Sequence, residues 1–246
     1  QAGPGGMSRP DLARRLVAEA LGTFCLVFAG TGAVVVNAVS GNPLGHGGVA
    51  AAFGLVVAIM IFGLGHLSGA HLNPAVTAAF AAARHFPAHE AVPYVLAQLA
   101  GAILASLSLR GLFGLAGGLG ATHPDHVGAL GALGLEAGLA GVLMIVILAV
   151  ATDTRAVGSM AAIAIGATIA LEALVMGPIT GASMNPARSL APALVAGDFT
   201  DLWIYLVGPV VGALAGAGVY AFLRDARPTT PRAAPAALIE QTEASG

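Results

Sequence analysis

Charge is scarce in this chain of 246 residues, because Asp, Glu and Arg together make up 9% of it and lysine is absent. A soluble domain usually carries about 25% charged residues. Hydrophobic residues make up 57% of the sequence and gather into long runs, so the composition excludes an ordinary soluble domain and predicts a membrane protein surrounded mostly by lipid. The net charge of -2 also argues against nucleic acid as a partner.

Cysteine is also scarce, since Cys25 is the only one. A single cysteine excludes an intrachain disulfide. The sequence contains no nucleophile–base pair, no phosphate-binding loop and no cluster of metal ligands. We therefore expect no enzymatic activity, no metal and no cofactor.

Long apolar stretches are what the sequence does contain. Each is near the length of about 20 residues that a helix needs to cross a bilayer. They predict an all-α membrane protein with six transmembrane helices, over Leu12–Val36, Gly48–Leu64, Ala91–Leu109, Ala129–Ala151, Met160–Met176 and Leu202–Leu223. The first stretch is longer than the core of a signal peptide, which is about 7–15 residues, so we expect it to be retained.

Two further apolar segments, Pro74–Arg84 and Pro186–Ala196, are about half as long. A helix of about eleven residues extends roughly 16 Å, which is half of a hydrocarbon core of about 30 Å. Two such pieces span the membrane only if they meet in the middle. The sequence therefore predicts two re-entrant half-helices.

Arginine is distributed unevenly over the two sides of the predicted membrane domain. Only Arg110 and Arg188 fall on one side; the other side has Arg9, Arg14, Arg15, Arg84, Arg155, Arg224, Arg227 and Arg232. The positive-inside rule then predicts a multi-pass protein of the cell membrane with both termini in the cytoplasm. Residues 1–6 precede Met7 and are interpreted as an expression remnant within an N-terminal tail, 1–11. Residues 225–246 have no periodic apolar face and are predicted to be a disordered cytoplasmic tail.

The channel domain expected over residues 12–224 contains an internal repeat. SGAHLNPA at 68–75 matches TGASMNPA at 180–187, and YVLAQLAGA at 94–102 matches YLVGPVVGA at 205–213. Each half, about 12–116 and 128–224, holds three full spans. Because three is odd, the second half is inverted relative to the first, and inverted repeats with broken helices mark a transport pathway near the midplane.

An Asn-Pro-Ala triplet begins each half-length segment, Asn73–Pro74–Ala75 in one and Asn185–Pro186–Ala187 in the other. Asn is a strong N-cap, and Pro suits the first helical position. Two half-helices that meet at their N-termini direct positive dipole ends and two amide donors at the pore centre. Such a centre repels cations, binds the oxygen of water and interrupts a proton wire. The alternative, two unrelated helix caps, is disfavoured by their matching positions.

These loops, SGAHLNPAVT at 68–77 and GASMNPARSLAP at 181–192, resemble the two signature loops of the aquaporin, or major intrinsic protein, family. The resemblance covers Leu12–Leu223 and is closest to the nodulin-like branch and its bacterial relatives. It implies the aquaporin fold, a homotetramer in membrane lipid, and a passive channel for water and small neutral solutes. Members of this branch commonly carry glycerol and undissociated metalloid acids such as boric or arsenous acid.

The same resemblance implies a selectivity filter of four side chains: Phe53, Ala173, Ala182 and Arg188. Water-selective members usually have histidine at the position of Ala173, so a methyl group there should widen the pore. Ser189 and Ala193 instead follow the pattern of water channels. A water-selective channel therefore remains the alternative to a channel that also passes glycerol and metalloid hydroxides.

Four other polar residues receive roles from the resemblance. Glu19 and Glu136 are expected to support the re-entrant loops through backbone N–H groups, although a proton relay is an alternative for an intramembrane carboxylate. His71 is expected to line the pore, where it could also act as a pH gate, and His66 to support the first loop. No cysteine or carboxylate lies within ten residues of either histidine, so a metal site is not expected.

An ion-coupled secondary transporter is the main alternative from another class, since inverted repeats occur there too. Such a protein needs ionisable groups along its path to bind the driving ion. Arg188 is the only charge that we place in the pore, which favours a passive channel. Glu172, the neighbour of Ala173, is expected either to meet the loop between the two halves, Gly111–Leu130, or to line a widened vestibule.

Overall fold

The computed structural model describes residues 10–152 and 160–224. Arg9, Arg155 and the predicted tail 225–246 lie outside these residues. The described part is built from α-helices and one short 3-10 helix. Six helices are long and apolar enough to cross a membrane: α1 (Leu12–Ser40), α2 (Gly45–Ser68), α4 (Ala88–Phe113), α5 (Ala129–Thr152), α6 (Ala161–Thr180) and α8 (Leu202–Leu223).

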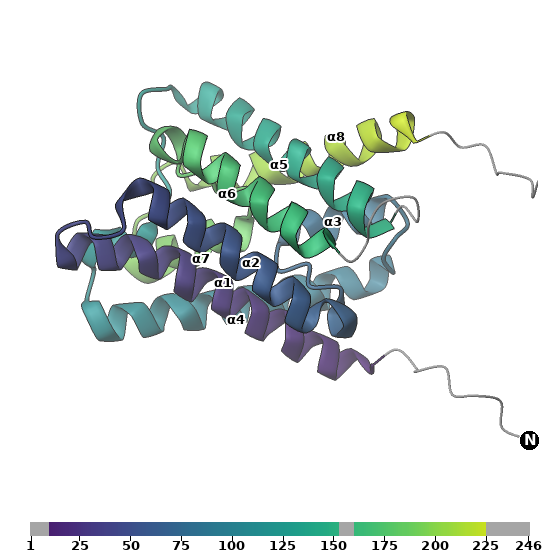
Figure 1. The fold of residues 1–246 in the computed structure, drawn as a ribbon, viewed down its shortest axis with the longest axis horizontal. Helices are drawn as coiled ribbons and strands as arrows, with labels where there is room; N and C mark the ends of the chain where they lie inside the picture. The colour runs from purple at the N-terminus through teal and green to yellow at the C-terminus, as the bar shows by residue number, and fades with distance from the viewer. Residues whose placement is uncertain (1–9, 153–159, 225–246) are drawn as a thin grey trace, which may run out of the picture.

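Two shorter helices complete the predicted set. Helix α3 covers Pro74–Ala82 and α7 covers Pro186–Ala196. Both are the half-helices expected from the sequence, and α3 ends two residues before the predicted Arg84. Figure 1 shows that α1 begins and α8 ends at the same end of the bundle, as an even number of full spans requires.

Several full spans are longer than their apolar stretches. Helix α1 continues past Val36 to Ser40, where Gly41 takes a left-handed conformation with φ 74°. Helix α2 begins three residues before Gly48 and continues past Leu64 to Ser68, where Gly69 ends it in the same way. The length of an apolar stretch indicates how much of a helix lies in the hydrocarbon core. The helix itself can extend beyond the core and ends at its capping residue. The 3-10 helix over Ala116–Gly120 was not predicted.

The two repeats pack alike. Helix α1 lies against α4 in the first half and α5 against α8 in the second, while α2 lies against α6 across the repeat boundary. Gly101 of α4 faces the backbone of Ala20, and Gly212 of α8 faces the backbone of Ala137, so closely that a Cβ would collide with the carbonyl oxygen in each case. Gly208 and Gly216 likewise face α5. The glycine pattern of the last span is thus used for packing within the chain.

Candidate functional site

The two half-helices meet at their N-termini and are joined there by reciprocal hydrogen bonds. Asn73 Oδ1 accepts from the N–H of Ala75 at 2.9 Å, and its Nδ2 donates to the carbonyl of Met184 at 2.8 Å. Asn185 Oδ1 accepts from the N–H of Ala187 at 3.0 Å, and its Nδ2 donates to the carbonyl of Leu72 at 2.9 Å. Each asparagine therefore caps its own helix and holds the loop of the other.

The loops before the asparagines share an unusual backbone. Ala70, Leu72, Ala182 and Met184 all have positive φ values, of 44°, 52°, 41° and 54°. Such values are uncommon for residues with side chains, and here they recur at corresponding positions of the two repeats. Backbone held in this way needs strong outside support.

Glu19 of α1 supplies that support for the first loop. Its carboxylate is fully buried and accepts hydrogen bonds from the N–H of His71 at 2.9 Å and of Leu72 at 2.8 Å. Ser68 Oγ and Gln98 Nε2 also donate to it, at 2.7 and 2.9 Å. Two of these bonds hold the loop itself, and the other two join the carboxylate to Ser68 at the end of α2 and to Gln98 on α4.

Glu136 of α5 occupies the equivalent place in the second repeat. It accepts from the N–H of Ser183 at 2.9 Å, the N–H of Met184 at 2.8 Å and Thr180 Oγ1 at 2.7 Å. The matched tyrosines add a further support in each half, because Tyr94 OH donates to the carbonyl of Ser68 at 2.9 Å and Tyr205 OH to that of Thr180 at 2.7 Å. The carboxylates are engaged in holding loops, which disfavours the proton relay.

Two cavities lead toward this centre from opposite sides. One, called here the inner cavity, is lined by both asparagines, His71 and apolar side chains of α2, α5 and α6. The other, an outer vestibule, is lined by the start of α2, by Gly120 and Ala121, and by part of α6. Phe53, Ala173 and Arg188 line both cavities. These three side chains therefore mark the boundary between the cavities, and Ala182 joins them on the inner side.

Arg188 is held from two directions at this boundary. Its Nη1 donates to the carbonyl of Gly120 at 2.6 Å, and its guanidinium carbon lies 4.9 Å from the centroid of the Phe53 ring. Thr122 Oγ1 donates to Ser189 Oγ at 2.8 Å, which fixes the same loop to α7. The sequence indicated that the loop around Thr122–His126 could occlude the pore, but it did not reveal the part of Gly120, since a backbone carbonyl leaves no signature in composition.

Ala173 and Ala182 bring only methyl groups to the boundary. Both are buried in the fold, with 8% and 5% of their surface exposed, and both line the inner cavity. The four residues predicted as a filter thus lie together. Arg188 is the one formally charged side chain that lines either cavity within the described part of the chain.

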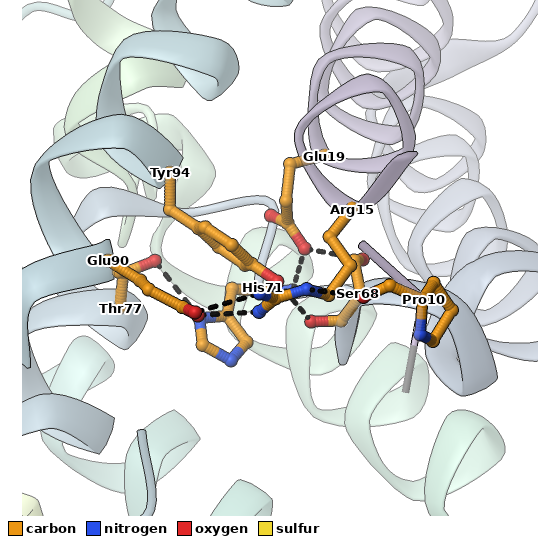
Figure 2. Close-up of polar contacts among 8 residues, drawn as sticks. All are labelled: Pro10, Arg15, Glu19, Ser68, His71, Thr77, Glu90 and Tyr94. Carbon is orange, nitrogen blue, oxygen red and sulfur yellow. Dashed lines mark hydrogen bonds and ion pairs between the residues drawn. The ribbon is translucent and has the colours of Figure 1, made fainter. Parts of the chain in front are cut away.

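His71 lines the inner cavity and lies within a ring of aromatic side chains. Its ring centroid is 4.8 Å from those of Phe80 and Phe86 and 5.3 Å from that of Tyr94. Its Nδ1 lies 3.2 Å from Thr77 Oγ1, and Figure 2 shows the ring directed at Thr77. The side chain is therefore fixed in orientation at the inner end of the path.

A buried ion pair lies behind His71. Arg15 of α1 donates to Glu90 of α4, Nη1 to Oε2 at 2.5 Å and Nη2 to Oε1 at 2.8 Å. Figure 2 shows the guanidinium reaching across to Glu90 beside Tyr94. The sequence predicted only the side of the membrane for Arg15 and not this partner, and in the fold only 4% of the residue is exposed. The first turn of α1 is packed against α4, so the charge needs a partner.

Two further polar residues, His66 and Glu172, have no side-chain hydrogen bond to the described part of the chain. His66 is exposed on α2 and forms no hydrogen bond or ion pair with any described residue, so its predicted support of the loop has no contact behind it. Helix α2 continues through His66 to Ser68, so this residue belongs to the helix and not to the loop that follows it. Glu172 is 7% exposed, and neither carboxylate oxygen has a hydrogen-bond partner in residues 10–152 and 160–224.

No group of three or more His, Cys, Asp or Glu side chains suited to a metal ion occurs among the described residues. The arrangement is a narrow passage with fixed donors at its centre and a fixed cation at its boundary. Such a passage orients and passes a neutral molecule without reacting with it.

Comparisons with known proteins agree with this arrangement. The sequence profile described as major intrinsic protein matches residues 6–220. Aquaporin NIP1-1 of Zea mays is 48% identical over 211 residues, which are 86% of this chain and 75% of that protein. Nodulin-26 of Glycine max is 48% identical over 211 residues, 86% of this chain and 78% of that protein. The X-ray structure of the aquaglyceroporin from Plasmodium falciparum aligns with a TM-score of 0.79 and 28% identity, covering 85% of this chain and 96% of that one.

Proposed function

The chain belongs to the major intrinsic protein family, and from that premise we propose that its pore passes glycerol-sized polyols and metalloid hydroxides as well as water. The broader statement, a multi-pass membrane channel for water and small solutes and not an enzyme, follows from membership of the family. What the proposal adds is the solute range and the residues that set it.

One observation carries the proposed solute range: two of the four side chains gathered at the boundary between the cavities are alanines. Ala173 and Ala182 contribute a methyl group each, against the ring of Phe53 and the guanidinium of Arg188. A methyl group leaves room that an imidazole would fill. The most similar relatives include Nodulin-26, and the solved structure that aligns is called an aquaglyceroporin.

The same geometry supports exclusion of ions and protons. Arg188 places a fixed positive charge at the boundary, and the N-termini of α3 and α7 place two positive dipole ends at the centre. A cation is repelled at both points. We assign Asn73 and Asn185 the role of orienting each passing molecule through their amide donors.

We further propose a homotetramer in the cell membrane, with the start of α1 and the end of α8 in the cytoplasm. Large apolar side chains are exposed on α2 at Leu55, Ile59 and Phe62 and on α6 at Leu171, Leu174 and Val175. Lipid or a neighbouring subunit must cover these faces. Arg14, Arg84 and Arg224 fall on the proposed cytoplasmic side by the order of the helices.

Stopped-flow light scattering on proteoliposomes tests the solute range. Vesicles that contain the wild-type channel are compared with empty vesicles for water, glycerol and boric acid. We expect all three fluxes to exceed those of empty vesicles. Water flux alone would favour a water-selective channel and overturn the proposed solute range while leaving the channel class in place.

A further inference from the structure

Helix α6 carries a proline in its last turn. Pro178 has no N–H, so it cannot donate to the carbonyl of Leu174, which lies four residues earlier. Leu174 directly follows Ala173, one of the boundary residues. The carbonyl receives its hydrogen bond from another helix, because His46 Nε2 lies 2.7 Å from the Leu174 oxygen. Since a carbonyl only accepts, Nε2 carries the proton.

The glycine before this proline makes room for the imidazole. A Cβ at Gly177 would meet His46 Cε1 at 2.7 Å, which is closer than real Cβ contacts. Leu174, Gly177 and Pro178 are related as i, i+3 and i+4 and so share one face of α6. On that face Gly177 has no side chain and Pro178 has no N–H. The His46 ring lies against Gly177 and reaches the carbonyl that Pro178 leaves without a donor.

A second close contact joins the same two helices deeper in the fold. Gly54 of α2 and Gly166 of α6 face each other so closely that a Cβ on either would collide with the backbone of the other. His46 and Gly54 are eight residues apart, as are Gly166 and Leu174. The antiparallel helices are therefore held at two points in one register. Phe53 and Ala173 lie within the segments between those points.

We propose that His46 is a positioning residue for selectivity, which fixes the separation of the outer ends of α2 and α6 and thereby the width of the passage between Phe53 and Ala173. The inference rests on the proposed role of these residues as the filter. Gly54 and Gly166 fix the pair deeper in the fold, and the His46–Leu174 hydrogen bond fixes the outer end. Without that bond the outer end of α6 is freer to move away from α2.

The consequence is a change in selectivity more than in overall flux. Water is smaller than the solutes, so a looser boundary raises the passage of a larger solute more than that of water. Loss of one hydrogen bond of ordinary strength corresponds to a change of about threefold to tenfold in an equilibrium. We expect His46→Phe to raise the glycerol-to-water permeability ratio by about threefold.

Matched variants separate the hydrogen bond from other effects of the ring. His46→Phe keeps an aromatic ring against Gly177 but has no donor, whereas His46→Gln keeps a donor. Pro178→Ala provides the N–H that α6 lacks, so in the double variant His46→Phe/Pro178→Ala the Leu174 carbonyl has a partner again within α6 while α2 and α6 stay unlinked. Gly177→Ala displaces the ring without changing His46 itself. Should His46→Phe not fold, Gly177→Ala tests the same contact.

Permeabilities of water, glycerol and the smaller solute formamide are measured in proteoliposomes of equal protein content. The proposal expects raised solute-to-water ratios for His46→Phe, for Gly177→Ala and for the double variant, and a wild-type ratio for His46→Gln. A wild-type ratio in both His46→Phe and Gly177→Ala overturns it. So does a wild-type ratio in the double variant, because it would show that the Leu174 carbonyl needs any hydrogen-bond partner and not the link to α2.

The failure of this inference is distinguishable from the failure of the proposed solute range. A wild-type channel that excludes glycerol contradicts the solute range. The formamide-to-water ratio then still decides whether His46 sets the width of the boundary.

Discussion

The guanidinium carbon of Arg188 lies 4.9 Å from the centroid of the Phe53 ring. The same guanidinium donates to the carbonyl of Gly120, so the cation is fixed between an aromatic face and a loop. Arginine attracted to a ring face in this way gains about 0.5–2 kcal/mol. A charge fixed in place acts on every ion that approaches the boundary.

Replacing Arg188 by valine is therefore expected to admit cations. A unit charge a few ångströms from the path costs a passing cation several kcal/mol at an effective dielectric constant of about 20, so the leak should rise about tenfold or more. Water permeability should persist. Cation flux into proteoliposomes, followed with a fluorescent indicator, provides the measurement. Arg188→Lys is the control that keeps the charge, and an equal leak in both variants would exclude charge as the cause.

Glu136 and Glu172 are both buried carboxylates, so the same substitution at each of them can be compared for its effect on stability. Glu136 accepts two hydrogen bonds from the second loop and one from Thr180 at the end of α6, whereas Glu172 has no hydrogen-bond partner among the described residues. In Glu136→Gln an amide NH₂ replaces one acceptor and faces backbone N–H groups. This should lower the free energy of unfolding by about 1–3 kcal/mol.

Glu172→Gln should change that free energy much less, because it breaks no hydrogen bond within the described chain. Thermal unfolding of the purified proteins in detergent compares the two. Each kcal/mol corresponds to a shift of about 2–4 °C for a chain of this length. An equally large shift in Glu172→Gln would mean that its carboxylate contacts a neighbouring subunit.

How much of this was foreseeable depends on the kind of signal. The eight α-helices could be predicted from the lengths of the apolar stretches and from the two Asn-Pro pairs, because both signals depend only on which side chains occur in which order. The hydrogen bonds of Asn73 to Met184 and of Asn185 to Leu72 could not be read from the sequence, since they join side chains to backbone atoms over 100 residues away. Arg15 shows the same limit, because its partner Glu90 is fixed only when α1 packs on α4.

Gly212 and Gly218 of α8 allow a second comparison of the same substitution at two positions. A Cβ at Gly212 would collide with the backbone of Ala137, whereas a Cβ at Gly218 would meet nothing within 4 Å. Gly212→Ala forces α8 away from α5 and should destabilise the protein by about 1–3 kcal/mol. Gly218→Ala should be neutral or stabilise it by up to about 1 kcal/mol, since alanine favours helix. Thermal unfolding that ranks the two variants in the opposite order would contradict the packing described for α8.

The ion pair of Arg15 and Glu90 is suited to a double-mutant cycle. Arg15→Met removes the guanidinium from a buried carboxylate and should cost about 3–5 kcal/mol. Arg15→Met combined with Glu90→Leu removes both charges and should recover much of that loss. Thermal unfolding of the two single variants and the double variant gives the coupling. Additive effects would show that the two groups act independently of each other.

The central claim is that Ala173 leaves the boundary wide enough for solutes larger than water. Ala173→His adds an imidazole opposite Phe53 and Arg188, at the place where the two cavities meet. Stopped-flow permeabilities of water, glycerol and boric acid for this variant and the wild type test the claim most directly. We predict that the variant retains water flux and loses most of its glycerol and boric acid flux. Equal glycerol flux in both proteins would contradict the account, because the boundary residue would then not set the width of the pore.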